Sequence, residues 1–145
     1  RYLFGPVSIS SALSPEARKR ITETYSVQFP SVGSLQGLQI EAKLPYSTTP
    51  YKESRFYGLA YKEAFKQLKH LLANMGTSVP TLFKQYSEFY ESQGAGFIAF
   101  NIDPDFNNCV DGLVIGDLSL IKAKKKERYL TNNCVSDSIN SKTND

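Results

Sequence analysis

The stretch "FNIDPDFNNCVDGLVIGDL", residues 100–118, decides how the second half of this chain folds. It places four aspartates and three asparagines in and around the junction of two hydrophobic runs, residues 97–102 and 113–121. Aspartate and asparagine favour turns because their side chains hydrogen-bond the nearby backbone and tolerate left-handed conformations. Two β-prone runs this close in sequence favour antiparallel pairing. The stretch therefore predicts a β-hairpin with a polar turn.

The same aspartates could also form a metal site, and their spacing can be compared with that of known calcium loops. If Asp103 opened an EF-hand calcium loop, the sixth position would need glycine and the twelfth a bidentate glutamate. Those positions hold Asn108 and Val114, so the calcium interpretation fails and we predict no metal site. Asp111 and Asp117 flank an apolar run, however, and a carboxylate facing the interior is costly unless it is paired. A structural turn explains much of the segment, and a substrate-facing acidic cluster is the alternative.

The first thirty residues predict a strand followed by a helix. Residues 2–10 are β-prone, and Pro6 cannot donate to a strand ladder, so we expect a bend or a sheet edge there. Residues 14–29 carry apolar side chains at every fourth position, as in an amphipathic helix. Ser14 is the candidate N-cap, and Pro30 ends the helix.

Two more helices are predicted in the middle of the chain. Residues 56–75 place apolar side chains on one helical face, and Gly76 suits the position just after the helix. A second helix follows, with Thr77 or Ser78 as its cap and Gly94 as its stop. Together with the strands, this order predicts an α+β fold with a mixed sheet.

The remaining segments set the domain organisation. Residues 31–54 show no periodicity, and long loops of this kind are usually lids, binding loops or disordered insertions. Residues 131–145 are polar and aperiodic, so we expect a disordered tail after a domain that covers residues 1–130. The chain opens without methionine, directly in a β-prone run, and we expect it to be cut from a longer protein.

Charge and cysteine content restrict the function classes. The net charge of +3 over 145 residues is too small to indicate a nucleic-acid partner. One basic patch is a candidate contact for phosphate or an anionic lipid surface, although such runs are often solvated faces. Its members are Lys122, Lys124, Lys125, Lys126 and Arg128. No apolar run reaches the roughly 20 residues that cross a bilayer. Cys109 and Cys134 form no CxxC pair, which favours a reduced, cytoplasmic setting.

Other catalytic patterns are missing from the sequence. His70 is the only histidine, so the chain has no HExxH motif and a Ser–His–Asp triad would rest on that residue alone. Lys84 and Tyr86 bracket a KQY string that offers a cation, an amide and a phenol on one helical turn. The ordinary alternative puts Tyr86 in the core and Lys84 in solvent. From the residues alone, the chain is part of an α+β domain without identifiable catalytic machinery.

Four strings nevertheless resemble one protein family. They are "YLFGPVSIS" (2–10), "VPTLFKQYSEF" (79–89), "FNIDPDFNNCVDGLVIGDL" (100–118) and "KKKERYL" (124–130). In this order they resemble the C-terminal half of bacterial GNAT-like N-acyltransferases, the group often labelled hemolysin, which includes enzymes of ornithine-lipid and related aminolipid synthesis. The resemblance runs from residue 2 to residue 130 and leaves out the variable loop at 31–54.

The resemblance implies a mixed sheet that splits to admit an acyl thioester. A fatty acyl group would pass from acyl carrier protein or coenzyme A to an amino-acid amine. Residues 2–10 would form a mid-sheet strand, and residues 97–121 a terminal hairpin beside the acceptor. Such chemistry needs a path for the amine proton and hydrogen-bond donors for the oxyanion. On position, the candidates are Asp111 and Tyr86 as catalytic residues, with Lys84, Asp103 and Asp105 as substrate-binding residues.

The resemblance also sets expectations about partners. The phosphate-cradling loop that holds the donor in this superfamily is not found in these residues and would lie before Arg1. We therefore expect no cofactor bound by this piece, no activity from it alone, and an upstream half of the same polypeptide as partner. A cytoplasmic location at the periphery of the inner membrane would follow, with the basic patch as membrane contact. The alternatives are a hemolysin-like membrane-active protein and a non-catalytic interaction module. A pore former should carry amphipathic hairpins or a long apolar segment, whereas the apolar runs here are short.

Overall fold

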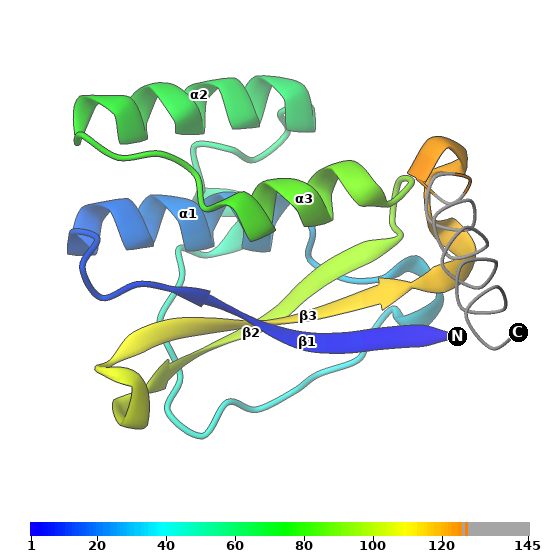
Figure 1. The fold of residues 1–145 in the computed structure, drawn as a ribbon, viewed down its shortest axis with the longest axis horizontal. Helices are drawn as coiled ribbons and strands as arrows, with labels where there is room; N and C mark the ends of the chain where they lie inside the picture. The colour runs from blue at the N-terminus through cyan, green and yellow to red at the C-terminus, as the bar shows by residue number, and fades with distance from the viewer. Residues whose placement is uncertain (126, 128–145) are drawn as a thin grey trace, which may run out of the picture.

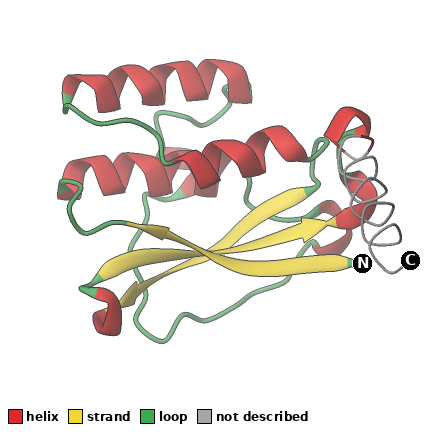
Figure 2. Cartoon of the chain, in the orientation of Figure 1, coloured by secondary structure: helices red, strands yellow, loops and turns green. Residues whose placement is uncertain are grey.

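The computed structural model describes residues 1–125 and 127. It shows a three-stranded antiparallel sheet with helices on one face (Figures 1 and 2). The strand order is β1-β3-β2, so the last strand in sequence lies in the middle. The elements are β1 (Tyr2–Ile9), α1 (Pro15–Gln28), α2 (Tyr61–Asn74), α3 (Thr81–Phe89), β2 (Ala95–Asp103) and β3 (Cys109–Asp117). The α+β class and the terminal hairpin are confirmed. The strand pairs among the described residues are all antiparallel, in place of the predicted mixed sheet.

Helix α1 lies between the sheet and α2, and α3 covers the sheet beside it (Figure 1). Five consecutive residues of α1, 21–25, are buried, which requires cover on both sides of the helix. The main core joins Val7 and Val114 of the sheet to Ile21 of α1 and Phe83 of α3. This arrangement leaves the other face of the sheet to the long loop that follows α1.

The start of α1 matches its predicted capping. Ser14 has extended backbone angles, and its Oγ accepts a hydrogen bond from the backbone N–H of Ala17 at 3.1 Å. This satisfies one of the free N–H groups of the first turn. The helix ends at Gln28, two residues before Pro30.

Helix α2 begins five residues later than the apolar pattern indicates. Phe56 is fully buried, but in the loop before the helix rather than on a helical face. Gly58 has a φ of 77°, a left-handed conformation that interrupts a helix, so the helix starts only at Tyr61. At the other end the prediction is confirmed, because Gly76 follows the helix with a φ of 75°.

Helix α3 differs from its predicted boundaries at both ends. Its N-cap is Pro80, and within the described residues no side chain caps it, so neither Thr77 nor Ser78 has the expected role. The helix ends at Phe89, ahead of Gly94. Gly94 lies in the following turn, where an added Cβ would meet the Glu91 carbonyl oxygen at 2.9 Å.

The β2–β3 connection confirms the predicted polar turn. Asp103 Oδ1 accepts a hydrogen bond from the backbone N–H of Asp105 at 3.1 Å and caps a short 3₁₀ turn. Asn107 and Asn108 both have a φ of 58°, in the left-handed region that asparagine tolerates. Strand β3 then starts at Cys109, four residues earlier than predicted, because the turn uses fewer residues than the polar run contains.

The predicted loop at residues 31–54 crosses the sheet face opposite α1. Val114 belongs to the core beneath the helices, so its neighbour Ile115 points to the other face. Gly96 pairs with Ile115, and a Cβ on Gly96 would lie 2.8 Å from the Ser31 carbonyl carbon. Val32 is fully buried there. The loop is therefore ordered cover for the sheet, with short 3₁₀ turns at residues 33–35 and 51–53.

Strand β1 lies at an edge of the described sheet, where the resemblance implied a mid-sheet position. Within the described residues it pairs only with β3. The side chains of Leu3 and Phe4 are 55% and 62% exposed. The other edge, β2, is partly covered, since Tyr46 N–H donates to the Phe100 carbonyl and Ile102 N–H donates to the Leu44 carbonyl.

Part of the predicted basic patch is helical in the part of the chain that the structure describes. Residues 123–125 and 127 are helical. Lys126, Arg128 and the predicted disordered tail at residues 131–145 lie outside the part of the chain that the structure describes.

Candidate functional site

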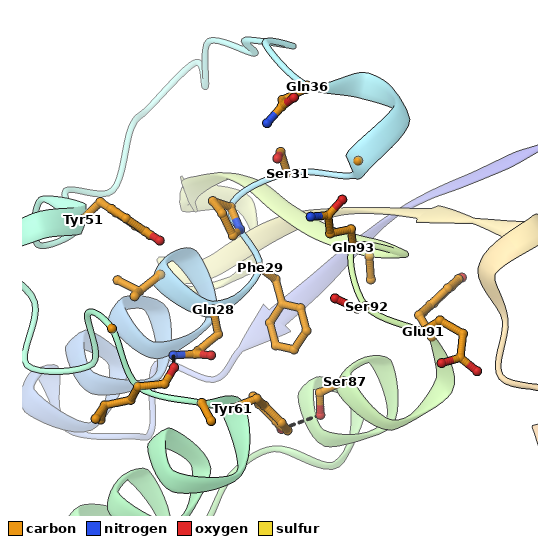
Figure 3. Close-up of a pocket in the computed structure, with 18 of the residues that line it drawn as sticks. Gln28, Phe29, Ser31, Gln36, Tyr51, Tyr61, Ser87, Glu91, Ser92 and Gln93 are labelled. Carbon is orange, nitrogen blue, oxygen red and sulfur yellow. Dashed lines mark hydrogen bonds between the residues drawn. The ribbon is translucent and has the colours of Figure 1, made fainter.

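The C-terminal ends of α1 and α3 and the N-terminal end of α2 enclose a pocket of about 650 Å³ (Figure 3). Its volume falls in the range of about 300 to 1,000 Å³ that is usual for small-molecule sites. Phe29, Tyr61 and Ser87 lie at its inner end, and Gln36 and Glu91 lie further out (Figure 3). The pocket brings together residues from the ends of three helices, and we take it as the candidate site.

Three hydroxyl groups form a hydrogen-bonded chain at the inner end of this pocket. The Tyr61 hydroxyl donates to Ser87 Oγ at 2.5 Å, and Ser87 Oγ donates to the Lys84 carbonyl at 2.7 Å. The Tyr25 hydroxyl lies 3.4 Å from the Tyr61 hydroxyl. Because Tyr61 gives its proton to Ser87, Tyr25 must be the donor in that last contact. The chain therefore runs in one direction, from Tyr25 to the Lys84 carbonyl.

The two tyrosines of this hydrogen-bonded series, Tyr25 and Tyr61, stay protonated at neutral pH. Burial raises the pKa of Tyr25, and its contact with Tyr61 adds to the effect. Burial also raises the pKa of Tyr61 above its ordinary value, and its hydrogen bonds with Ser87 and Tyr25 offset part of that rise. Both groups thus act as neutral hydroxyls with fixed hydrogen-bond directions.

Gln28 holds one wall of the pocket in place. Its side-chain amide nitrogen donates to the carbonyls of Phe56 and Leu59, at 3.2 and 3.1 Å. These two bonds use both amide protons and fix the loop that leads into α2. The amide oxygen of Gln28 is left as an acceptor on a side chain that lines the pocket.

The helix ends give the pocket a negative electrostatic bias. The C-terminal ends of α1 and α3 carry partial negative charge, and their last turns contain no lysine or arginine. The N-terminal end of α2 carries partial positive charge, which Glu63 in its first turn offsets. Glu91 adds a carboxylate to the lining, and Lys122 is the cation among the described lining residues.

The predicted catalytic residues Asp111 and Tyr86 are not brought together. Tyr86 lies on the helical side of the sheet, with its ring 6.3 Å from that of Phe97. Asp111 alternates with the core residue Val110 and so points to the opposite face, where Ser8 Oγ donates to it at 2.7 Å. The sheet therefore separates the two side chains.

The predicted substrate-binding residues lie away from the pocket. Ala95 lines the pocket at the start of β2, and Asp103 ends the same strand eight residues later, about 26 Å away at 3.3 Å per residue. Asp105 is exposed in the turn beyond it. Lys84 is exposed on α3, and its carbonyl, rather than its amine, takes part in the hydroxyl chain.

Among the described members of the predicted basic patch, one lines the pocket. Lys122 lines the pocket, and its backbone N–H donates to the Phe89 carbonyl at 2.9 Å, which fixes it beside the end of α3. Lys124 is exposed and Lys125 half-buried on the helical turn that follows.

Two other polar groups are structural. Asp117 is buried and accepts hydrogen bonds from the Ser119 hydroxyl at 2.6 Å and the Ser34 hydroxyl at 3.2 Å, with Arg1 at 3.5 Å. Hydrogen bonds from Ser119 above all hold its pKa at about 2. Cys109 is buried, its thiol lies 3.4 Å from Asp111 Oδ1, and burial raises its pKa.

Sequence patterns alone do not indicate the pocket, because its residues meet only through tertiary packing. Tyr61 was expected inside a longer helix, and Gln28 at the end of another. The available signal was the KQY string, since Ser87 follows it directly and shares its helix.

The described residues contain no group of three or more histidine, cysteine, aspartate or glutamate side chains that could hold a metal. Over the same residues, none of the helices is both long and apolar enough to cross a bilayer. Comparisons with protein-family models, curated proteins and solved structures gave no match to this chain.

Proposed function

We propose that this chain is the acceptor-side part of a GNAT-like N-acyltransferase of membrane aminolipid synthesis. The enzyme would move a fatty acyl group from acyl carrier protein or coenzyme A to an amino-acid amine. It would work in the cytoplasm at the surface of the inner membrane, with Lys124 and Lys125 among the residues that face anionic lipid. The amine would bind in the pocket at the helix ends.

The observation that carries this proposal is the position of Ser87. Residues 79–89, one of the strings that resemble the acyltransferase family, include the whole of α3, and α3 places Ser87 at the inner end of the pocket. A side chain within that string therefore reaches a cavity of suitable size for an amino acid. The strings at residues 2–10 and 100–118 form β1 and the hairpin that support the helices.

The open edge of β1 supports the expected second part of the enzyme. An unpaired strand edge with exposed apolar side chains is a template for another strand. Leu3 and Phe4 supply those side chains, on opposite faces of the strand. The proposal assigns this edge to the donor-binding half of the polypeptide, which would extend the sheet.

The proposed reaction balances without a further reactant. The amine nitrogen, after it loses one proton from its ammonium form, attacks the thioester carbonyl. The new C–N bond forms as the C–S bond breaks and the nitrogen loses a second proton. The leaving thiolate takes up one of the two protons, and the other goes to solvent. Amide and thiol are the products. The chain's contribution would be to hold and orient the amine for this attack.

The pocket replaces the hairpin as the centre of the proposed site. Asp111 and Asn101 are paired across β3 and β2, and Asn101 is six residues from the pocket residue Ala95, about 20 Å along the strand. An amine bound in the pocket therefore lies out of reach of Asp111. Tyr86 and Asp111 remain predicted catalytic residues, and Asp111→Asn below tests the second of them.

A purified-enzyme assay tests the proposal. The protein would be the longer polypeptide that joins this chain to its proposed donor-binding half, supplied with a fatty acyl thioester and a mixture of amino acids. Thiol release and the mass of the N-acyl product would be recorded for the wild type and for Ser87→Ala, Asp111→Asn and Asp105→Asn. We expect product from the wild type, a large loss for Ser87→Ala and wild-type turnover for Asp105→Asn. If folded protein forms no acylated amine, acyl transfer is refuted. If only Asp111→Asn loses product formation, the active site lies at the hairpin and not at the pocket.

A further inference from the structure

We infer that the pocket recognises its ligand by an ammonium group, and that Lys122 selects ligands which also carry a carboxylate. The inference rests on the proposed function for its setting, because it specifies how the acceptor is held. It concerns binding alone, so it is tested without any acyl transfer. The hydrogen-bonding capacity that the buried polar groups have left determines which ligands fit.

The hydroxyl groups of Tyr61 and Ser87 can still accept hydrogen bonds but have no proton left to donate. Ser87 gives its proton to the Lys84 carbonyl, and Tyr61 gives its proton to Ser87. A hydroxyl has one proton and two acceptor lone pairs, so each oxygen keeps capacity only as an acceptor. Ser87 is 8% exposed, and water has little access to satisfy it. A ligand that fits here must bring N–H or O–H donors.

Gln28 reinforces the same preference. Both protons of its amide are committed to the carbonyls of Phe56 and Leu59. What its side chain can offer a ligand is the carbonyl oxygen. An ammonium group has three donors and no acceptor, which matches oxygens of this kind. A carboxylate or phosphate brings only acceptors and would face unpaired lone pairs at this end.

The electrostatics favour a cation over a neutral donor. The C-terminal ends of α1 and α3, which carry partial negative charge, border the pocket, and Glu91 adds a full negative charge to its lining (Figure 3). The ring of Phe29, 5.2 Å from that of Tyr61, lines the same space and presents an aromatic surface that attracts cations. The donor substrate, with its phosphates and thioester, has the opposite character. We therefore assign the pocket to the acceptor amine and not to the acyl donor.

Lys122 gives the ligand an orientation. It is the cation among the described lining residues, and its backbone is fixed to the end of α3 through the Phe89 carbonyl. An ammonium group bound among the oxygens would leave a carboxylate on the same ligand free to pair with Lys122. Free amino acids have this charge arrangement, whereas simple amines lack the carboxylate.

Three matched probes test the inference. Norleucine carries both charges, pentylamine is the same molecule without the carboxylate, and hexanoate is the same molecule without the amine. Each would be titrated into the ¹⁵N-labelled 145-residue chain while the amide signals of Phe29, Tyr61 and Ser87 are followed by NMR. We expect norleucine to bind best, pentylamine next, and hexanoate at least about tenfold more weakly than pentylamine, a difference of about 1.4 kcal/mol. Hexanoate binding as tightly as pentylamine, or no shift at these amides with any probe, would overturn the inference.

Single-residue variants test which side chains contribute to ligand binding. Glu91→Gln keeps the shape of an exposed side chain and should weaken norleucine and pentylamine alike. Lys122→Met should weaken norleucine to the level of pentylamine and leave pentylamine unchanged. Asp105→Asn removes the same charge as Glu91→Gln, but at the far end of the sheet, and should change neither. Equal effects of Glu91→Gln and Asp105→Asn would reduce the pocket to nonspecific charge attraction and refute the inference.

The two proposals can fail separately. If norleucine binds as expected and the longer polypeptide acylates no amine, the ammonium site stands and acyl transfer fails. If amines are acylated but none of the three probes binds in the pocket, acyl transfer stands and the acceptor binds elsewhere.

Discussion

Asp117 is 1% exposed, and it keeps its charge because hydroxyl groups and an arginine surround it. Its hydrogen bonds tie the end of β3 to Ser119 on one side and to Ser34 in the loop beneath the sheet on the other. At the residue scale, an interior carboxylate here has a structural role. The aspartates of the opening stretch thus divide into two turn residues, one strand residue held by Ser8, and this one.

The pKa of Asp117 gives a prediction about stability and pH. Its folded pKa of about 2 lies below the value of about 3.9 for an unfolded aspartate. The charged form therefore stabilises the fold fully above about pH 4, and this contribution disappears as pH falls through about 2. We expect Asp117→Asn to lower the free energy of unfolding at pH 7, with a smaller difference at pH 3.

Urea unfolding of the wild type and the variant across this pH range measures the effect. Asp105→Asn, an exposed change of the same kind, should show little difference at any pH. A destabilisation by Asp117→Asn that stayed constant from pH 7 to pH 2.5 would contradict the assigned pKa.

The buried thiol of Cys109 should react slowly. Burial raises its pKa, and the neighbouring carboxylate of Asp111 adds to the rise, so little thiolate forms near neutral pH. In a Cys134→Ser background, we expect alkylation by iodoacetamide at pH 8 to be at least about tenfold slower than for the chain unfolded in urea. Equal rates in the two states would show that the thiol is accessible and ionises normally.

At the scale of elements, local side-chain chemistry predicted boundaries well where a residue satisfies its own backbone. Ser14 caps α1, Gly76 ends α2, and the aspartates and asparagines after Asp103 form the turn, all through contacts within a few residues. The apolar pattern failed at Phe56, which is buried by packing against other segments while its backbone is not helical. Periodicity reports burial, and burial alone does not specify a helix.

The two predicted caps can be compared directly. Ser14→Ala removes a real N-cap bond and should cost about 1 kcal/mol of unfolding free energy. Ser78→Ala changes a residue that precedes α3 without capping it and should stay within about 0.5 kcal/mol of the wild type. Chemical denaturation of both variants checks this. A larger loss for Ser78→Ala than for Ser14→Ala would contradict the assigned helix starts.

The pocket could not be predicted from the sequence for a physical reason. Tyr61 and Ser87 are 26 residues apart and meet because α2 and α3 pack with their ends at one place. Their hydrogen-bond directions depend on partners that no pattern in the sequence reveals, such as the Lys84 carbonyl and Tyr25. The predicted acidic site failed to assemble for the complementary reason, since strand alternation sends Asp111 to the face away from Tyr86.

At the scale of the whole molecule, the exposed edge of β1 should make the isolated chain associate. Phe4 is 62% exposed beside a strand edge that pairs with no other strand among the described residues, a combination that promotes pairing between chains. We expect sedimentation velocity to show association that increases with concentration, and Phe4→Lys to weaken it at least about tenfold. A chain that stays monomeric over the whole concentration range would remove the support that this edge gives to a second half.

The central claim is acyl transfer to an amine held in the pocket, and lipid mass spectrometry tests it most directly. A host without aminolipids would express the longer polypeptide in its wild-type, Ser87→Ala, Asp111→Ala and Asp105→Asn forms. We predict a new N-acyl amino-acid lipid from the wild type and from Asp105→Asn, with strong reduction in Ser87→Ala. No new lipid from folded wild-type protein, with candidate amino acids supplied, would contradict the central claim.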